Sequence, residues 1–333
     1  MKQKTNANTQ SYSNQSRAFK IYSARELNDD NSVRPKDVIS GGLLVPNGIT
    51  LLHGKAKAGK TYLAMQMGLN IASATPWLGN EIAKRKKVFY LQAELPYYPM
   101  RDRVKTMLLN YEHPSAKENF QMSEPRKLDI CDEDDYKILN EIITQEGYKV
   151  VIIDPLVYFH EKNENSNDEM SSVMSRFRDL VNETDISLII IHHDGKGGEM
   201  TGGDASRGAS AIFGAVDSDI RLLSPKTPKG GGAKYQNMEC SLRHAASPEP
   251  KHLYFSEETL LFSTEHATND ISKLKKIIAR QPSTTKSELI KAVMESLECG
   301  KSKAYALIGS ATQNRSISVS PEGIVSVPDS AFC

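Results

Sequence analysis

Cysteine is scarce in this sequence, and its four cysteines are far apart. Cys131, Cys240, Cys299 and Cys333 form no Cys-x-x-Cys pair, so neither a zinc site nor a disulfide framework is expected. Scattered free thiols are typical of a reducing compartment.

Long apolar runs are missing as well. The first residues lack the apolar core of a signal peptide, and no segment approaches the roughly 18 apolar residues of a membrane-spanning helix. Residues 1–25 are instead polar, which predicts a disordered tail. We expect a cytoplasmic protein without a membrane partner.

Neither sign of charge dominates, because the net charge is only +1. Residues 271–333 carry nine Lys or Arg and five Asp or Glu, while the rest of the chain carries 33 basic and 36 acidic residues. A small basic segment on a mildly acidic body is a weak indication of a polyanionic partner.

Between residues 49 and 191, short apolar runs alternate with amphipathic segments. Strands that are apolar throughout are buried on both faces, and the helices between them cover those faces. The fold class is therefore α/β, with a mostly parallel, twisted sheet. The expected strands are 49–53, 87–92, 149–153 and 186–191, and the expected helices are 60–74, 134–146 and 169–184.

After residue 191 the pattern changes to a glycine-rich loop at 195–208. Strand-like runs at 218–223, 235–243 and 252–262 follow, separated by segments rich in turn-forming residues. These runs predict β-hairpins that extend one edge of the sheet.

The end of the chain has a different organisation. A polar linker at 264–270 precedes a segment that reads helix, helix, turn, helix and hairpin over residues 271–333. This order is typical of a winged helix-turn-helix domain, although a helical interaction module has the same order. We therefore expect one large domain at 26–263, the linker, and a small domain at 271–333.

One segment fits the phosphate-binding pattern Gly-x-x-x-x-Gly-Lys-Ser/Thr and lies between a predicted strand and a predicted helix. In such a loop, backbone N–H groups surround the phosphates and the glycines allow close approach. Lys60 is expected to bridge the β- and γ-phosphates of ATP, and the Thr61 hydroxyl to ligate Mg²⁺. The expected nucleotide contacts are Gly54, Lys55, Ala56, Lys57, Ala58, Gly59, Lys60, Thr61 and Tyr62.

Two carboxylates end predicted strands. Asp154 closes a buried strand, which predicts that it holds Mg²⁺ through water. The next residue is Pro155, where many P-loop enzymes place the glutamate that activates water. Glu94, just after the 87–92 strand, is the expected general base, and a plain strand-end carboxylate is the alternative.

His192 and His193 end the 186–191 strand. They fall on the same edge of the sheet, where one of them is expected to sense the γ-phosphate. A buried packing histidine is the alternative. Because neighbouring residues on a strand point to opposite faces, the two are not expected to chelate one metal ion.

The sequence from Gly41 to Leu223 resembles the RecA-type ATPases of the RepA-like group, which are hexameric replicative helicases of plasmids and phages related to DnaB-type helicases. The resemblance covers a little over half of the chain. The matching pieces are the phosphate loop, Trp77-Leu78-Gly79 ahead of VFYLQAELP, VVIIDPL followed by FHEKNENSNDEM, IIIHHDGKGG, Arg207-Gly208-Ala209-Ser210, and the strand from Asp217 to Arg221.

The resemblance implies roles for the residues that match. Glu94 matches the catalytic glutamate, Asp154 the Mg²⁺-holding aspartate, and His193 or His192 the sensor. The loops at 163–169 and 196–206 match those that face single-stranded DNA in the channel of a homo-oligomeric ring.

Rings of this kind hydrolyse ATP between subunits, and a basic residue of the neighbouring subunit reaches the γ-phosphate. Arg207, Arg221 and Arg243 are the candidates here. Arg243 is favoured slightly over Arg207, because similar proteins carry a basic residue on the corresponding strand.

Two features depart from the group. The 196–206 segment has a single lysine, Lys196, against Glu199 and Asp204, and no aromatic residue to stack on bases. The segment 271–333 is absent from the smallest members, and we expect it to bind duplex DNA. Its candidate contacts are Lys301, Lys303, Tyr305 and Arg315.

Three functions compete. The first is a hexameric ATP-driven DNA helicase for replication of a plasmid, phage or mobile element. The second is a RecA-like regulatory or loader ATPase without processive unwinding. The third is a DNA-binding initiator or repressor with a vestigial ATPase, which the complete set of Lys60, Thr61, Glu94 and Asp154 disfavours.

Overall fold

The structure is a computed structural model, and it describes most of the chain. The described residues are 21–109, 114–194, 209–224, 235–264, 268–280, 284–297, 299–313, 317–320 and 323–327. The chain divides into two units, Met1–Pro35 and Lys36–Cys333.

The described residues of the first unit, 21–35, contain the short helix α1 (Ala24–Asp29). The Ser23 hydroxyl accepts the backbone N–H of Glu26, and the Glu26 carboxylate accepts the backbone N–H of Ser23. This reciprocal capping box satisfies two N–H groups that the helix itself leaves unpaired. No residue of α1 is buried.

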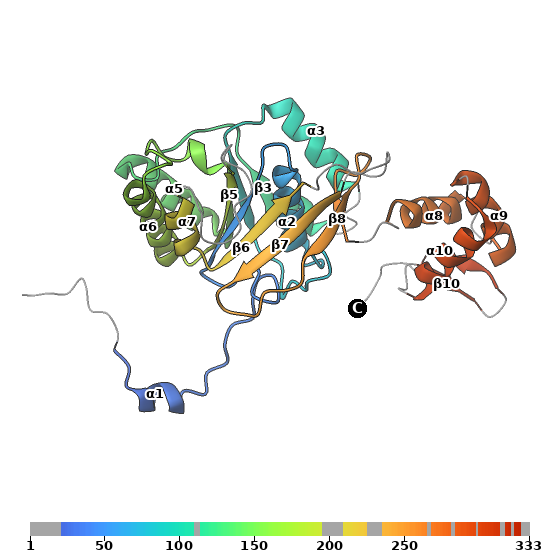
Figure 1. The fold of residues 1–333 in the computed structure, drawn as a ribbon, viewed down its shortest axis with the longest axis horizontal. Coiled ribbons are helices and arrows are strands. Elements are labelled where there is room, and N and C mark those ends of the chain that lie inside the picture. The colour runs from blue at the N-terminus through green and yellow to red at the C-terminus, as the bar shows by residue number, and fades with distance from the viewer. Residues whose placement is uncertain are drawn as a thin grey trace, which may run out of the picture. The chain divides into compact units, whose positions relative to one another are not determined.

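The second unit is built on a nine-stranded sheet, visible in Figure 1, with the order β3-β2-β4-β5-β1-β6-β7-β8-β9. The first six strands in this order are parallel, and β7, β8 and β9 continue the sheet in antiparallel fashion. The strands are β1 (Ile49–Gly54), β2 (Val88–Gln92), β3 (Phe120–Met122), β4 (Val150–Asp154), β5 (Ser187–His193), β6 (Ser218–Leu223), β7 (Tyr235–Leu242), β8 (Lys251–Phe255) and β9 (Phe262–Ser263).

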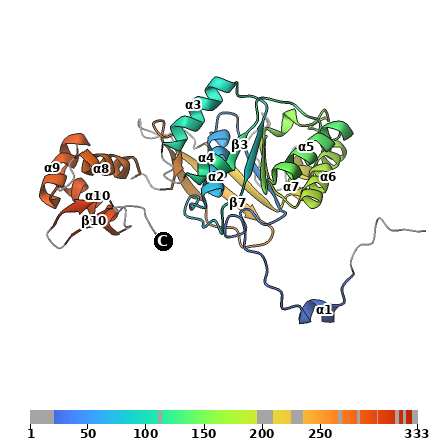
Figure 2. The same ribbon diagram turned by 180° about the vertical axis from the view of Figure 1, so that it is seen from behind.

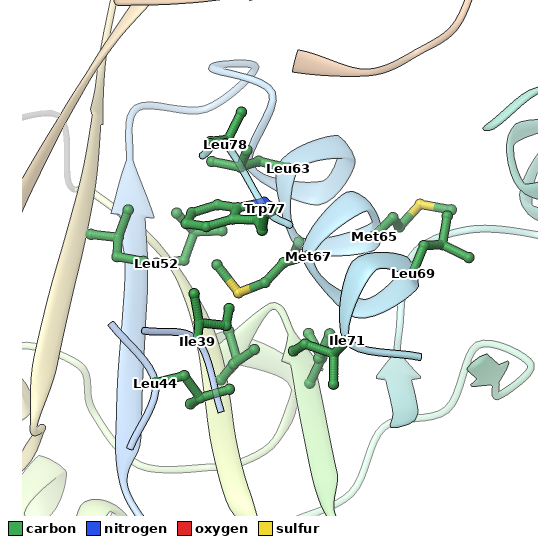
Figure 3. Close-up of a cluster of buried hydrophobic side chains, with 14 of the residues drawn as sticks. Ile39, Leu44, Leu52, Leu63, Met65, Met67, Leu69, Ile71, Trp77 and Leu78 are labelled. Carbon is green, nitrogen blue, oxygen red and sulfur yellow. The ribbon is translucent and has the colours of Figure 1, made fainter. Parts of the chain in front are cut away.

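Helices cover both faces of the parallel part, because its strands are apolar on both sides. On one face lie α2 (Lys60–Ser73), α3 (Tyr97–Leu108) and α4 (Ser115–Asn119). Figure 3 shows the core on this face, where the fully buried Trp77 lies next to Leu52, Leu63 and Met67.

The other face is covered by α5 (Glu133–Glu146), α6 (Asn167–Thr184), α7 (Ala209–Ala215) and the single-turn helix η1 (Leu156–Tyr158). Figure 2 shows these helices from behind. The buried residues of α6 recur every three or four positions, which is the spacing of one helix face. They are Met170, Val173, Met174, Phe177, Leu180 and Val181.

A separate hydrophobic cluster forms near the end of the chain. It is enclosed by α8 (Thr268–Arg280), α9 (Lys286–Ser296), α10 (Lys301–Gln313) and the antiparallel pair β10 (Ser318–Val319) and β11 (Val325–Ser326). Its members include Leu274, Leu289, Ile308 and Val325, each at most 1% exposed.

The predicted α/β fold with a mostly parallel sheet and added hairpins is confirmed. The strand predicted at 252–262 is wrong as a single element, because a turn around Leu260 separates β8 from β9. Sequence patterns also missed β3, α3, α4 and α7. The glycine-rich segment predicted at 195–208 lies outside the described residues. Within the part of the chain that the structure describes, no helix has the length and apolar character needed to cross a membrane.

Candidate active site

The predicted phosphate loop, Glu94, Asp154 and His193 meet at the carboxyl edge of the parallel strands. Gly54 at the end of β1 is paired with His193 of β5, and Gln92 at the end of β2 is paired with Asp154 of β4. Strands of one direction end at the same edge, which is where α/β proteins bind their ligands. This edge therefore brings together pieces of sequence that lie far apart in the chain.

The loop from Gly54 to Gly59 leads from β1 into α2 with a backbone that glycine makes accessible. Gly54 has φ 151° and Gly59 has φ 93°. A Cβ atom on Gly54 would lie 2.4 Å from the carbonyl oxygen of Leu222, and one on Gly59 would lie 2.7 Å from Cζ of Phe262. Larger residues at either position would displace the loop.

Lys60 is the first residue of α2, and its side chain returns into this loop. Its Nζ donates to the carbonyl oxygens of Gly54, at 2.7 Å, and Lys55, at 2.9 Å. Burial lowers the pKa of Lys60 to about 8, while the charges of Asp194, Asp154 and Glu94 oppose that shift. A buried ammonium held by backbone carbonyls suits an anionic phosphate.

Asp154 is 5% exposed and accepts a hydrogen bond from the Tyr90 hydroxyl at 2.6 Å. The Thr61 hydroxyl also bonds to its carboxylate. Burial raises the pKa of Asp154, and the bonds from Tyr90 and Thr61 oppose that rise. A hydroxyl and a carboxylate in contact, next to a phosphate loop, are the oxygen donors that Mg²⁺ prefers.

Glu94 lies in the turn that follows β2, and it is exposed. Its backbone N–H donates to Oε1 of Gln92 at 3.1 Å, which fixes the start of the turn. Its carboxylate acts electrostatically on Lys60, Asp154 and His193. The structure thus places this carboxylate at the site with access to water.

The side chains of His192 and His193, consecutive residues of β5, point to opposite faces of the sheet. Burial and the charge of Lys60 lower the pKa of His193, and its Nδ1 is buried without a hydrogen-bond partner among the described residues. His192 points to the other face, where its Nδ1 lies 3.8 Å from Oε1 of Glu164. Burial lowers the pKa of His192 to about 4. A strand alternates its side chains between faces, so the two cannot share one role.

The three candidate arginines have different positions. Arg243 directly follows β7, which is antiparallel, so it lies at the amino edge of the parallel strands. Its Nη2 donates to the carbonyl oxygen of Gly214 at 2.7 Å. The six residues of β6, Ser218–Leu223, separate the two edges by roughly 17 Å, so Arg243 cannot reach the phosphate loop of its own chain. Arg221 is in β6 near Asp194. Arg207 lies outside the described residues, as do Lys196, Glu199 and Asp204.

Three further residues at this edge were not predicted. They are Tyr90, His53 and Arg103. His53 lies between two carboxylates, and the Arg103 guanidinium lies 4.7 Å from the centre of the Tyr62 ring. A histidine inside a buried apolar strand was the available signal for His53. Tyr90 gave none, because tyrosine is common in strands.

The comparison with protein families decides the identity. A family model described as the AAA domain matches residues 15–199, more than half of the chain, and these include the phosphate loop, Glu94, Asp154 and His193. The chain belongs to the AAA domain family. It is an enzyme, a P-loop ATPase, and nucleotide binding follows from this membership.

Two solved structures are similar in fold. The first is an ATPase domain, which superposes with a TM-score of 0.51 at 12% identity, over 66% of this chain and 85% of that chain. The second is a DnaB-like replicative helicase, described together with its interactions with primase. It superposes with a TM-score of 0.51 at 11% identity, over 66% of this chain and 57% of that chain. At such identities the likeness shows that this AAA domain has the RecA-like fold found in DnaB-like helicases.

Proposed function

We propose that this AAA domain protein is an ATP-dependent DNA helicase of the RepA-like type, which acts in replication of a plasmid, phage or mobile element. One observation carries the proposal. Lys60, Thr61, Asp154 and Glu94 gather at one edge of the sheet, whereas Arg243 is exposed at the opposite edge. A neighbouring subunit can therefore supply its own Arg243 to this site.

Each residue has a proposed task in hydrolysis. Lys60 and the loop N–H groups hold the β- and γ-phosphates of ATP, and Thr61 and Asp154 hold Mg²⁺ through water. The metal ion, when bound, neutralises charge on the phosphate oxygens. Glu94 takes the proton of the attacking water. His193, on the phosphate side of β5, senses the γ-phosphate.

The assembly we propose is a hexameric ring around single-stranded DNA. In such a ring, Arg243 of one subunit reaches the phosphates bound by the next, so hydrolysis requires the interface. In this arrangement the segment 163–169, whose last three residues begin α6, faces the channel. The second predicted channel segment, 196–206, lies outside the described residues.

The base assignment is tested with Glu94→Gln, which keeps the size of the side chain and removes its basicity. We expect ATP binding to be retained and turnover to fall about 10²–10⁴-fold. Equilibrium binding of a fluorescent ATP analogue and steady-state phosphate release measure the two quantities. Turnover near that of the wild type would remove Glu94 from the mechanism.

The arginine assignment is tested by mixing two inactive variants. Arg243→Ala keeps its phosphate loop, and Lys60→Ala keeps its arginine, so mixed rings contain some complete sites. Mixing should raise phosphate release above that of either variant alone. Arg126→Ala, at another exposed arginine, is the control and should keep the wild-type rate. A mixture no more active than its components would contradict the proposal.

Unwinding is tested on forked DNA with a labelled strand. Strand displacement that depends on ATP supports the helicase. Hydrolysis stimulated by single-stranded DNA without displacement would identify the alternative, a regulatory or loader ATPase. This alternative is supported by the sequence of 196–206, which has a single basic residue, Lys196.

Residues 271–333 are proposed to bind duplex DNA as a winged-helix-like domain. The support is three helices and a hairpin around one core, with Lys301 and the half-exposed Tyr305 on α10. Lys301→Glu combined with Tyr305→Ala should weaken duplex binding in a gel shift at least about tenfold. Lys291→Ala, at an exposed lysine of α9, is the control. Unchanged binding in the double variant would favour a protein-interaction module.

A further inference from the structure

A charged cluster with a buried histidine at its centre lies directly beneath the phosphate loop, and hydrolysis as proposed above does not use it. Its centre is His53, the residue before Gly54, which is 4% exposed. Nδ1 of His53 lies 2.6 Å from Oδ1 of Asp194, and Nε2 lies 3.0 Å from Oδ1 of Asp219. The edge of its ring meets Phe213 of α7, with 5.0 Å between ring centres.

This arrangement favours the charged form of the histidine. Burial opposes the positive charge, but the hydrogen bond to Asp194 and the nearby carboxylates of Asp194 and Asp219 outweigh it and raise the pKa of His53 to about 9. Burial also works against the charge of Asp194, yet His53 and Arg221 lower the pKa of that carboxyl. The ring is therefore an imidazolium between two carboxylates near neutral pH.

Asp194 connects this cluster to the phosphate loop through its main chain. Its backbone N–H donates to the carbonyl oxygen of Gly54 at 3.1 Å. The same oxygen accepts Nζ of Lys60 at 2.7 Å. Asp194, whose carboxylate contacts His53, and Lys60 of the phosphate loop thus donate to the same carbonyl oxygen.

We propose that His53 is a positioning residue for ATP hydrolysis, which fixes Asp194 against Gly54 and thereby sets the loop that carries Lys60. The inference rests on the proposed ATPase site, because His53 lies outside that site and is proposed to set its geometry. His53 itself lies on the face of the sheet that carries α7, away from α2.

The proposal predicts a specific effect of charge. His53→Gln keeps a polar side chain of similar reach but removes the positive charge between Asp194 and Asp219. Arg221, 4.0 Å from Asp194, is then the cation that remains beside them, and the two carboxylates repel each other more strongly. We expect kcat/KM for ATP to fall at least about tenfold. Asp219→Asn in the same chain removes the repulsion, so the double variant should recover at least about threefold.

A purely structural role predicts something else. If His53 only fills space, the second substitution adds a defect and the double variant is no better than His53→Gln. That outcome, or a single variant within twofold of the wild type, would overturn the proposal. His252→Gln, at an exposed histidine that bonds Asn237, is the matched control and should keep the wild-type rate.

A second variant covers the case in which His53→Gln does not fold. Asp194→Asn keeps the size and the backbone N–H of residue 194 but removes the charge that His53 holds, and it should lower kcat/KM at least about fivefold. A wild-type value would overturn the proposal. The wild type separates the two levels: if it does not hydrolyse ATP, the proposed function fails, whereas a working wild type with unaffected variants refutes only the role of His53.

Discussion

The His53 cluster predicts how the stability of the protein depends on pH. The pKa of His53 is raised from 6.5 to about 9 in the folded chain. A raised pKa means that the folded form binds the proton more tightly, so the cluster stabilises the fold fully below pH 6.5. That contribution is lost as the pH rises through 9.

The size of the effect follows from the shift. One pKa unit corresponds to about 1.36 kcal/mol, so protonated His53 contributes about 3 kcal/mol to the free energy of unfolding. Lys60 acts in the opposite direction, because its pKa is lowered from 10.5 to about 8. Its destabilising contribution is present below pH 8 and disappears above 10.5. Comparison with His53→Gln isolates the histidine, since Lys60 is present in both proteins.

Trp77 makes the measurement specific. It is the single tryptophan of the sequence, and it is fully buried in the core that contains α2. Urea titrations followed by its fluorescence at pH 6 and pH 10 give the free energy of unfolding of this region. The advantage of the wild type over His53→Gln should shrink by about 3 kcal/mol between the two pH values. A difference that stays constant would show that His53 is not held as an imidazolium.

Three other predictions follow from the same geometry. Tyr90→Phe removes the donor to Asp154, so a titration with Mg²⁺ should show half-saturation of turnover at about 10–100-fold higher metal concentration; an unchanged titration would contradict the role of Tyr90. Gly59→Ala places a Cβ against Phe262, so binding of a fluorescent ATP analogue should be lost, and wild-type affinity would refute this. Leu289→Ala should destabilise the α8–α10 cluster by about 2–5 kcal/mol in hydrogen exchange while ATP turnover persists. Parallel loss of turnover would contradict separate domains.

The amino-acid sequence was sufficient for the features that depend on neighbouring residues or on strand direction. The phosphate loop was predicted because its glycines, Lys60 and Thr61 lie within eight consecutive residues, 54–61. Glu94 and Asp154 were predicted to share an edge because both follow apolar strands, and parallel strands end together. The structure places both at that edge.

Other features needed the tertiary structure. The sequence left His192 and His193 as alternatives, because the face of each depends on how β5 pairs with β1. Hairpins were expected after residue 191, but only the register of β7 on β6, with Leu242 paired with Ser218, places Arg243 at the amino edge.

The cluster beneath the phosphate loop shows the limit most clearly. His53 and Asp194 are 141 residues apart in the chain, yet their side chains are in contact. Sequence periodicity reports burial and local geometry, and it carries no information about which distant charges will meet. Only the packing of β5 and β6 on either side of β1 brings two carboxylates to one histidine. Those carboxylates keep the histidine charged although burial opposes the charge.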